Sequence, residues 1–474
     1  MELKTGLGIL FLGFQLLFAQ AQNIKIINPT YLGNYTRNYY GNKAPDNLKV
    51  NWKVHLGSGQ SIVSAKAGPV LWAGAGWTGQ PLLVEEDGKL FIIQGCFDHK
   101  LKKIDAETGK TVWSYLFDDI LKGTGTIWTH PDTHELIILQ GSRLGNDKNL
   151  YSKIVPSYRA ISYSSGKELW RLNSRQTRSY SRDVDASALL LNNLGYIGLE
   201  NGIFTVFNPD PSLAEVRDGI LQPKILHEEM LYTPNDAALH GGNLVTEASP
   251  SIMNGHIYLA SGAGHVYGFN LSKNQIDWDF YIGSDMDGSP VVTSDSCLLI
   301  SVEKQYIKGQ GGILKLDPKK TENDAVVWYM PSGDKVFSTW LGGVIGTAAI
   351  NDQYKSPEAP ALAAFVAIDG FTYVIKHQEK DAGKQVLGFD GVRKFDTPVT
   401  VFKYKTGPSI STPILTENRL IVPCYNGLYL FSYDSNNEFK LLGHLPESIE
   451  ATPVIHNGRV YVAARSGYYY CLGQ

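Results

Sequence analysis

Residues Glu247 to Trp278 read EASPSIMNGHIYLASGAGHVYGFNLSKNQIDW, and residues Gly79 to Trp113 read GQPLLVEEDGKLFIIQGCFDHKLKKIDAETGKTVW. Both stretches open near a proline, continue through three short apolar strands separated by turns, and end on a strand that carries Trp. A unit of this length cannot bury both faces of its own sheet, so neighbouring units must stack on one another. The sequence therefore predicts a repeat architecture built from β-sheets.

Six further copies of the unit can be found. Four clear copies begin at Asp185, Asp287, Ser411 and Glu450, and two weaker ones lie near Trp128 and Ala348. Their spacing of about 50 residues suits the four-stranded blade of a propeller. The predicted fold class is an all-β propeller of eight four-stranded blades, or of seven if one weak copy is miscounted.

The two ends of the repeat region predict how the ring closes. The last copy stops on its third strand, residues 468–472, and has no Trp strand. Residues 48–54 (LKVNWKV) are a Trp strand with no blade before them. If this N-terminal strand completes the last blade, the ring closes and no sheet edge stays exposed.

The N-terminus predicts export. Residues 1–21 combine Lys4, an apolar stretch and an Ala-Gln-Ala cleavage pattern, which is typical of a signal peptide. Residues 22–47 then form an N-terminal extension, and 48–474 the propeller. No Cys lies near the cleavage pattern to carry a lipid anchor, and no later segment predicts a transmembrane helix. We expect a periplasmic or secreted monomer.

The charge composition narrows the class of partner. Charged residues make up 19% of the chain and the net charge is −3, with no long basic run. Binding to nucleic acid needs a basic surface, so the sequence argues against a nucleic-acid partner.

Residues Asp105 to Trp113 (DAETGKTVW) resemble the A-x-T-G-K-x-x-W signature of PQQ-like propeller repeats, and Ser164 to Trp170 (SSGKELW) is a second match. The resemblance implies a Gly in a turn with positive φ and a Trp that lies across the neighbouring blade. This family contains quinoprotein dehydrogenases as well as non-catalytic binding proteins. The dehydrogenases carry a pair of adjacent cysteines over the cofactor, and this chain has no Cys-Cys dipeptide.

The cysteines themselves show no metal-ligand spacing. They are Cys96, Cys297, Cys424 and Cys471. The sequence favours buried free thiols in strands. A Cys424–Cys471 disulfide is the alternative in an oxidising compartment.

Acidic residues recur at one position of the repeat, three residues before the positions 188, 250, 290 and 453 at which the copies align. Asp185, Glu247, Asp287 and Glu450 occupy this position, and Asp183 and Asp285 add a second acid to two of the blades. First strands line the channel of a propeller, so we expect an acidic ring at its mouth that could hold Ca²⁺, an amine or sugar hydroxyls. The alternatives are that these acids accept backbone N–H groups in turns, and that Arg182 neutralises the patch.

Two Trp-containing loops precede blades at comparable offsets. Trp77 and Trp340 lie in Gly-rich stretches, followed at equivalent points by Gly79 and Gly346. We expect both Trp rings on the same channel face as the acids, where flat rings beside carboxylates suit a carbohydrate or a flat cofactor. The alternative is simple loop packing.

No GxSxG, HExxH or P-loop motif is present. The favoured function is a non-catalytic propeller that binds a protein or glycan partner through its channel face or rim, with no cofactor. The alternative is a quinone- or Ca²⁺-dependent enzyme, a dehydrogenase or a carbohydrate-active enzyme, with an acid among Asp185, Asp287 and Glu247 as general base.

Overall fold

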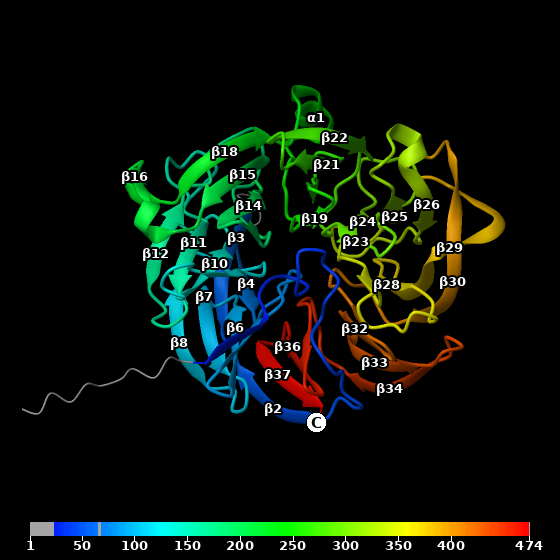
Figure 1. Cartoon of the computed structure of the whole chain (residues 1–474), viewed down its shortest axis with the longest axis horizontal. Coiled ribbons are helices and arrows are strands. Elements are labelled where there is room, and N and C mark those ends of the chain that lie inside the picture. Colours follow the sequence, from blue (N-terminus) through cyan, green and yellow to red (C-terminus); the bar gives the residue numbers. More distant parts are fainter. Residues whose placement is uncertain (1–22, 65–67, 474) are drawn as a thin grey trace, which may run out of the picture.

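The computed structural model describes residues 23–64 and 68–473, and they form a ring of eight four-stranded antiparallel blades (Figure 1). The first blade contains β5 (Leu82–Glu86), β6 (Lys89–Gly95), β7 (Lys100–Asp105) and β8 (Thr111–Leu116). The second contains β9 (Thr126–Thr129), β10 (Leu136–Gly141), β11 (Tyr158–Ser162) and β12 (Glu168–Leu172). The third contains β13 (Leu189–Leu191), β14 (Leu194–Gly198), β15 (Ile203–Asn208) and β18 (Lys224–Met230).

The remaining blades follow the same order from the channel outwards. The fourth contains β19 (Ser251–Met253), β20 (His256–Ala260), β21 (His265–Asn270) and β22 (Gln275–Tyr281). The fifth contains β23 (Val291–Val292), β24 (Leu298–Val302), β25 (Gly312–Leu316) and β26 (Val326–Pro331). The sixth contains β27 (Ala349–Ile350), β28 (Leu362–Val366), β29 (Phe371–Leu387) and β30 (Lys394–Lys405). The seventh contains β31 (Ile414–Leu415), β32 (Arg419–Cys424), β33 (Gly427–Tyr433) and β34 (Phe439–Leu445).

The eighth blade closes the ring as predicted. It contains β35 (Val454–His456), β36 (Arg459–Ala463), β37 (Tyr468–Gly473) and, as its outermost strand, the N-terminal β2 (Val50–His55). β2 pairs antiparallel with β37, with Trp52 opposite Cys471. One chain end thus supplies the strand that the other end lacks, which removes an open sheet edge.

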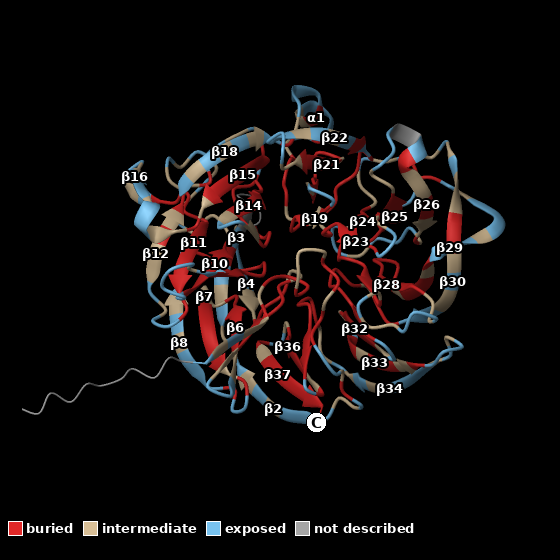
Figure 2. Cartoon of the chain, viewed as in Figure 1, coloured by how far each residue is buried: buried red, intermediate tan, exposed pale blue. Residues whose placement is uncertain are grey.

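Burial falls from the channel to the rim (Figure 2). Every residue of the second-layer strand β10 is buried, whereas residues of the outermost strand β22 alternate between exposed and partly buried up to Asp279. Inner strands are covered by neighbouring blades on both faces, so they are continuously apolar, and outer strands face water on one side.

The Gly and Trp of the repeat signature make contacts between neighbouring blades, not within one blade. Trp113 of β8 donates its Nε1 hydrogen to the carbonyl oxygen of Tyr163 in the next blade (2.9 Å). Its ring packs on Gly166, which has φ +67°, and a Cβ there would lie 2.9 Å from the Trp113 ring. Trp52 makes the same contact across the ring closure, to the carbonyl oxygen of Ala106 (3.0 Å). The glycine therefore serves both the left-handed turn and the close approach of the ring.

The N-terminal extension closes the channel on one side. β1 (Ile24–Asn28) pairs with β5, and the following residues run into the centre of the ring (Figure 1). Arg37 is fully buried there and donates to the carbonyl oxygens of Pro250 and Tyr31. The extension also hydrogen-bonds the first strands of several blades, for example Ile252 N to Tyr35 O (2.9 Å). It therefore acts as a plug that ties the blades together.

The other elements are short additions to the ring. They are the hairpin β3 (Ser58–Ser64) and β4 (Gly68–Ala73), the hairpin β16 (Glu215–Arg217) and β17 (Ile220–Gln222), the helix α1 (Pro234–Leu239), and the 3₁₀ turns η1 (Pro211–Leu213) and η2 (Glu322–Ala325). No helical segment in the described ranges has the length and apolar content needed to cross a membrane. The predicted signal peptide lies outside the described residues.

The four cysteines are buried free thiols, which confirms the favoured prediction over a Cys424–Cys471 bridge. Burial raises the pKa of the Cys424 thiol to about 11, so the group is inert at neutral pH.

Candidate functional site

A ladder of hydroxyl groups fixes the register of the blades around the channel. The backbone N–H of Ser187 donates to the Oγ of Ser249, and the N–H of Ser249 donates to the Oγ of Ser289, both at 2.9 Å. Ser289 and Thr347 continue the ladder with the same spacing. The residues two positions earlier are therefore equivalent and form one ring at the channel mouth: Thr78, Lys122, Asp185, Glu247, Asp287, Ile345, Ile410 and Glu450.

Carboxylates gather on three consecutive blades of this ring. We call them the acidic arc, and it comprises Asp183, Asp185 and Glu200 of the third blade, Glu247 of the fourth, and Asp285, Asp287 and Glu303 of the fifth. Glu200 and Glu303 follow the second strands of their blades, which return to the same face. The alignment of blade starts did not reveal these two, because they lie outside the aligned position.

Lys122 is the residue of the second blade that the sequence prediction missed. Its ammonium lies 2.7 Å from Asp185, 3.6 Å from Asp183 and 4.0 Å from Glu200. Burial alone would lower the pKa of Lys122, but the charges of Asp185 and Glu200 outweigh burial and hold this pKa well above its usual value. Lys122 is therefore a permanent cation within the acidic arc.

Arg143, and not Arg182, is the second cation of this region. Arg143 Nε lies 2.8 Å from Asp183 Oδ2, and together with Lys122 it holds the pKa of Asp183 below its usual value against the effect of burial. Arg182 instead donates to the backbone carbonyl oxygens of Ser174, Leu150 and Ser152. The suggestion that Arg182 neutralises the patch is thus wrong, because its guanidinium is used to tie loops together.

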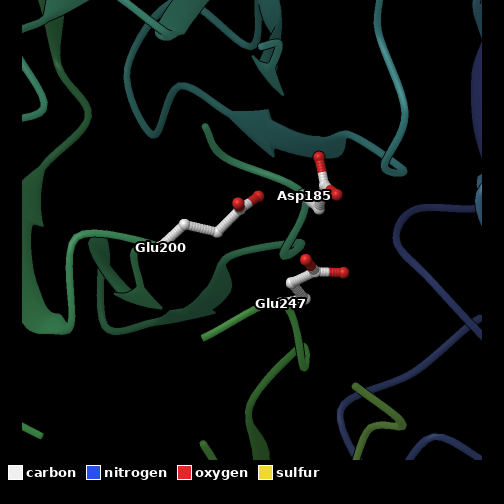
Figure 3. Close-up of side chains that lie close together, drawn as sticks. All are labelled: Asp185, Glu200 and Glu247. Carbon is white, nitrogen blue, oxygen red and sulfur yellow. The ribbon is translucent and has the colours of Figure 1, made fainter. Parts of the chain in front are cut away.

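Asp185, Glu200 and Glu247 bring one oxygen each to within 4.8 Å of one another (Figure 3). This is the spacing of ligands around a divalent cation, and it is the one such group in the described residues. The fit to Ca²⁺ is nevertheless poor, because the ammonium of Lys122 already lies 2.7 Å from Asp185.

The other half of the acidic arc has no cation of its own. Within the described residues, no Lys, Arg or His nitrogen lies within 4.0 Å of Glu247, Asp285, Asp287 or Glu303. Burial raises the pKa of Asp285 to about 6, although Asn243 Nδ2 donates to its Oδ2 (2.5 Å), and the charge of Glu247 raises it as well. Burial and the charge of Asp285 raise the pKa of Glu303 to about 9.

Aromatic side chains form the opposite side of the mouth. Trp77, Phe337, Trp340 and Tyr425 pack over Ile345 and Ile410, and we call this set the aromatic arc. The ring centroids of Trp77 and Trp340 are 5.9 Å apart. The two Trp-containing loops therefore meet at the channel face, as the sequence predicted, and both rings are partly exposed.

Trp77 joins the two arcs. Its Nε1 donates to Glu247 Oε2 (2.8 Å), and the Lys122 ammonium lies 4.9 Å from the ring centroid. Trp77 and Thr78 both have positive φ, 52° and 64°, which is strained for side chains of this size. Strain of this kind is held in place by the surrounding structure and is concentrated at functional sites.

Glu450 belongs with the aromatic arc and not with the acids. Tyr425 donates its hydroxyl to Glu450 Oε1 (2.9 Å), and Arg465 lies 3.4 Å from Oε2. Its charge is therefore matched locally, so the ring of four equal carboxylates that the repeat predicts is reduced to an arc.

Two exposed tyrosines lie near the acidic arc. Tyr180 is 52% exposed and Tyr306 is 48% exposed. Tyr306 lies in a bend with φ +60°, where its ring stacks on His240 with centroids 4.5 Å apart. Burial raises the pKa of Tyr180, and the charges of Asp285 and Glu247 raise it as well.

A small cavity lies beneath the mouth. Its volume is about 10 Å³, room for about one water-sized group, and its lining includes Asp185, Glu247 and Asp287. Tyr31 of the plug forms part of the same lining, and its hydroxyl is 2.7 Å from Thr412 Oγ1. The polar mouth thus has a closed floor made by the N-terminal extension.

Comparisons with known proteins show the fold alone. No protein-family model matches the chain, and no curated protein matches its sequence. BamB from Moraxella catarrhalis superposes with a TM-score of 0.52 and 10% identity over 90% of this chain and 100% of that one. Quinohemoprotein alcohol dehydrogenase from Comamonas testosteroni gives a TM-score of 0.55 and 12% identity over 94% and 80%. These likenesses agree with the sequence resemblance at the level of the fold.

Proposed function

We propose that this chain is an exported, non-catalytic propeller that binds a carbohydrate at its channel mouth, between the acidic arc and the aromatic arc. The observation that carries the proposal is the position of Trp77. One side of this residue hydrogen-bonds an acid through Nε1, and its ring lies beside Trp340. A sugar ring has the same two-sided character, since its C–H face packs on an aromatic ring while its hydroxyl groups donate to carboxylates.

The closed floor supports a site for a bound ligand. Binding sites for small molecules are concave and combine apolar walls with a few fixed polar groups. Here the aromatic arc supplies the apolar wall, the acidic arc supplies acceptors, and Tyr31 lies below them. The same strained backbone at Trp77 and Thr78 holds the central ring in place before a ligand arrives.

A protein partner at the rim is the second candidate. The loop between β26 and β27 exposes Val336 (66%) and Leu341 (50%) next to the aromatic arc. Exposed apolar side chains of this size are typical of contact surfaces. The enzymatic alternative has less support as a metal-dependent enzyme, because Lys122 stands where a metal ion would bind.

The test is equilibrium binding of β-1,4-linked hexose oligosaccharides, measured by calorimetry and Trp fluorescence. Trp77→Ala and Trp340→Ala should each weaken binding roughly tenfold or more, because each removes a stacking surface. Tyr281→Ala is the matched control: Tyr281 is a 47% exposed aromatic on the outermost strand β22, and its loss should leave binding unchanged. Equal loss in all three variants, or binding to none of the oligosaccharides, would contradict the proposal.

A further inference from the structure

Charge balance at the mouth identifies what kind of sugar the site takes. The acidic arc has seven carboxyl groups, and the described residues supply it with two cations, Lys122 and Arg143. Both cations serve the third blade. Glu247, Asp285, Asp287 and Glu303, which we call the unpaired acids, have no ion pair within the described part of the chain. Asp285 and Glu303 are buried, and Glu247 and Asp287 are partly buried. Carboxylates withdrawn from water without a partner are costly, and such groups in native structures have a cation as their usual counterpart.

Two unpartnered acceptors point to the same conclusion independently of charge. Asn243 is 1% exposed, and its Oδ1 has no hydrogen-bond donor in the described ranges although its Nδ2 donates to Asp285. Asp185 Oδ1 is likewise buried without a donor, and this residue lines the small cavity together with Glu247 and Asp287. Gly262 places no side chain over Asn243 Oδ1 and Asp285 Oδ1, which both lie 2.8 Å from the position of its absent Cβ. These two acceptors are therefore left without a donor among the described residues at the site.

The arrangement suits an organic cation better than a metal ion. The unpaired acids do not bring three oxygens to within metal-ligand spacing of one another, and the one group that does, Asp185, Glu200 and Glu247, is served by Lys122. Trp77 contacts Glu247, and two half-exposed tyrosines lie on neighbouring loops: the Tyr180 N–H donates to the carbonyl oxygen of Gly242, beside Asn243, and Tyr306 follows Glu303 by three residues. Aromatic faces attract organic ammonium groups and are not ligands for hard metal ions.

We propose that the carbohydrate bound at the mouth carries a protonated primary amine, as an unacetylated amino sugar does, and that this amine is held by Glu247, Asp285, Asp287 and Glu303. This inference rests on the proposed function and names the class of its ligand. The ammonium group donates three hydrogen bonds, and the sugar ring to which it is attached packs on the aromatic arc.

The experiment compares two probes that differ only at nitrogen: the β-1,4-linked glucosamine tetramer and its fully N-acetylated counterpart. At pH 6 and low salt, the amine form should bind at least tenfold more tightly to the wild-type protein. Asp287→Asn and Glu303→Gln should each remove most of this preference. Asp147→Asn, which changes an exposed acid that is paired with Lys148, is the matched control and should keep the preference.

Folding of the variants does not obscure the result. Replacing one of several crowded carboxyl groups by its amide removes a group whose charged form is disfavoured in the free protein, so the melting temperature should equal or exceed that of the wild type. Equal binding of the two tetramers would overturn the amine assignment and leave carbohydrate binding standing. Binding of neither tetramer would overturn both proposals. Micromolar binding of Ca²⁺ alone, lost in Asp287→Asn, would assign the acids to a metal ion and overturn the amine proposal.

Discussion

Replacing Lys122 by Met removes the one buried ammonium that Asp183, Asp185 and Glu200 share, while keeping an unbranched side chain of similar length. Lys122 is 7% exposed, so its partners would be left as buried carboxylates without their cation. Breaking a buried ion pair from one side costs about 3–5 kcal/mol of unfolding free energy. For a chain with about 450 ordered residues, the unfolding entropy is about 1 kcal/mol/K, so the melting temperature should fall by about 3–5 °C.

The size of this loss should depend on pH. Burial raises the pKa of Asp185 to about 7 in the folded protein, and removal of Lys122 raises it further. A carboxyl group whose folded pKa lies above its unfolded value binds an extra proton in the folded state between the two values. Its folded state is therefore favoured at low pH and loses stability as the pH rises through that window, from about 4 to about 7 in the wild type. In the variant the window extends higher, so the difference should be small at pH 5 and large at pH 8.

The assay is scanning calorimetry of wild type and variant at pH 5 and pH 8, at one scan rate. Lys320→Met is the matched control, because it removes an exposed ammonium whose nearest carboxylate, Asp317, is 3.8 Å away. Exposed ion pairs contribute about 0–1 kcal/mol to the free energy of unfolding. The double variant Lys122→Met with Asp185→Asn should recover part of the loss. If Lys122→Met melted within 1 °C of the wild type at pH 8, or lost as much at pH 5, the role assigned to this cation would be refuted.

Two further predictions concern the fold. Gly166→Ala should cost about 2–4 kcal/mol, because a Cβ would press on Trp113 and adopt a positive φ, whereas Gly219→Ala has the same backbone strain but open space and should cost about 1–2 kcal/mol. Equal shifts of the two urea midpoints would show that the Trp contact between blades is unimportant. Arg37→Met should leave the carbonyl oxygens of Pro250 and Tyr31 without their donor, cost about 2–5 kcal/mol, and speed proteolysis of the plug. An unchanged cleavage pattern in limited proteolysis would contradict this.

The ring of blades could be predicted from the sequence because the turns and strand ends of each blade repeat the same residues. The turn glycines at positions 109 and 166 and the Trp strands mark where one blade meets the next, and Trp52, Trp113, Trp170, Trp278 and Trp328 each donate Nε1 to a carbonyl oxygen of the following blade. The closure by β2 could be predicted because the last blade has no outermost strand after residue 473, whereas the segment at residue 50 is an outermost strand with no blade of its own. Regular contacts between neighbours leave a regular pattern, so they can be predicted.

The site was predicted only in part, because its members are where the repeat is least regular. The second blade starts with Lys122-Gly-Thr-Gly and has no proline, so an alignment near Trp128 placed its start three residues late and missed Lys122. Glu200 and Glu303 follow second strands, where no repeated residue marks them. The plug gave no signal at all, since Arg37 is buried by residues that are more than 200 positions away in the chain.

The mouth is divided into two arcs because one position of the repeat, two residues before the hydroxyl ladder, can hold different residue types. The hydroxyl ladder through Ser187, Ser249, Ser289 and Thr347 fixes the backbone of each blade start, so the residue two positions earlier can change without altering the fold. Blades three to five place Asp or Glu there, and blades six and seven place Ile345 and Ile410. Ile is the residue that a stable, plugged channel would favour throughout, since buried unpaired acids reduce stability. Lys122 offsets the cost of Asp185 and the Trp77 N–H part of the cost of Glu247, whereas Asp287 has no ion pair in the described residues, so a bound cation would supply the counter-charge that the fold does not provide there.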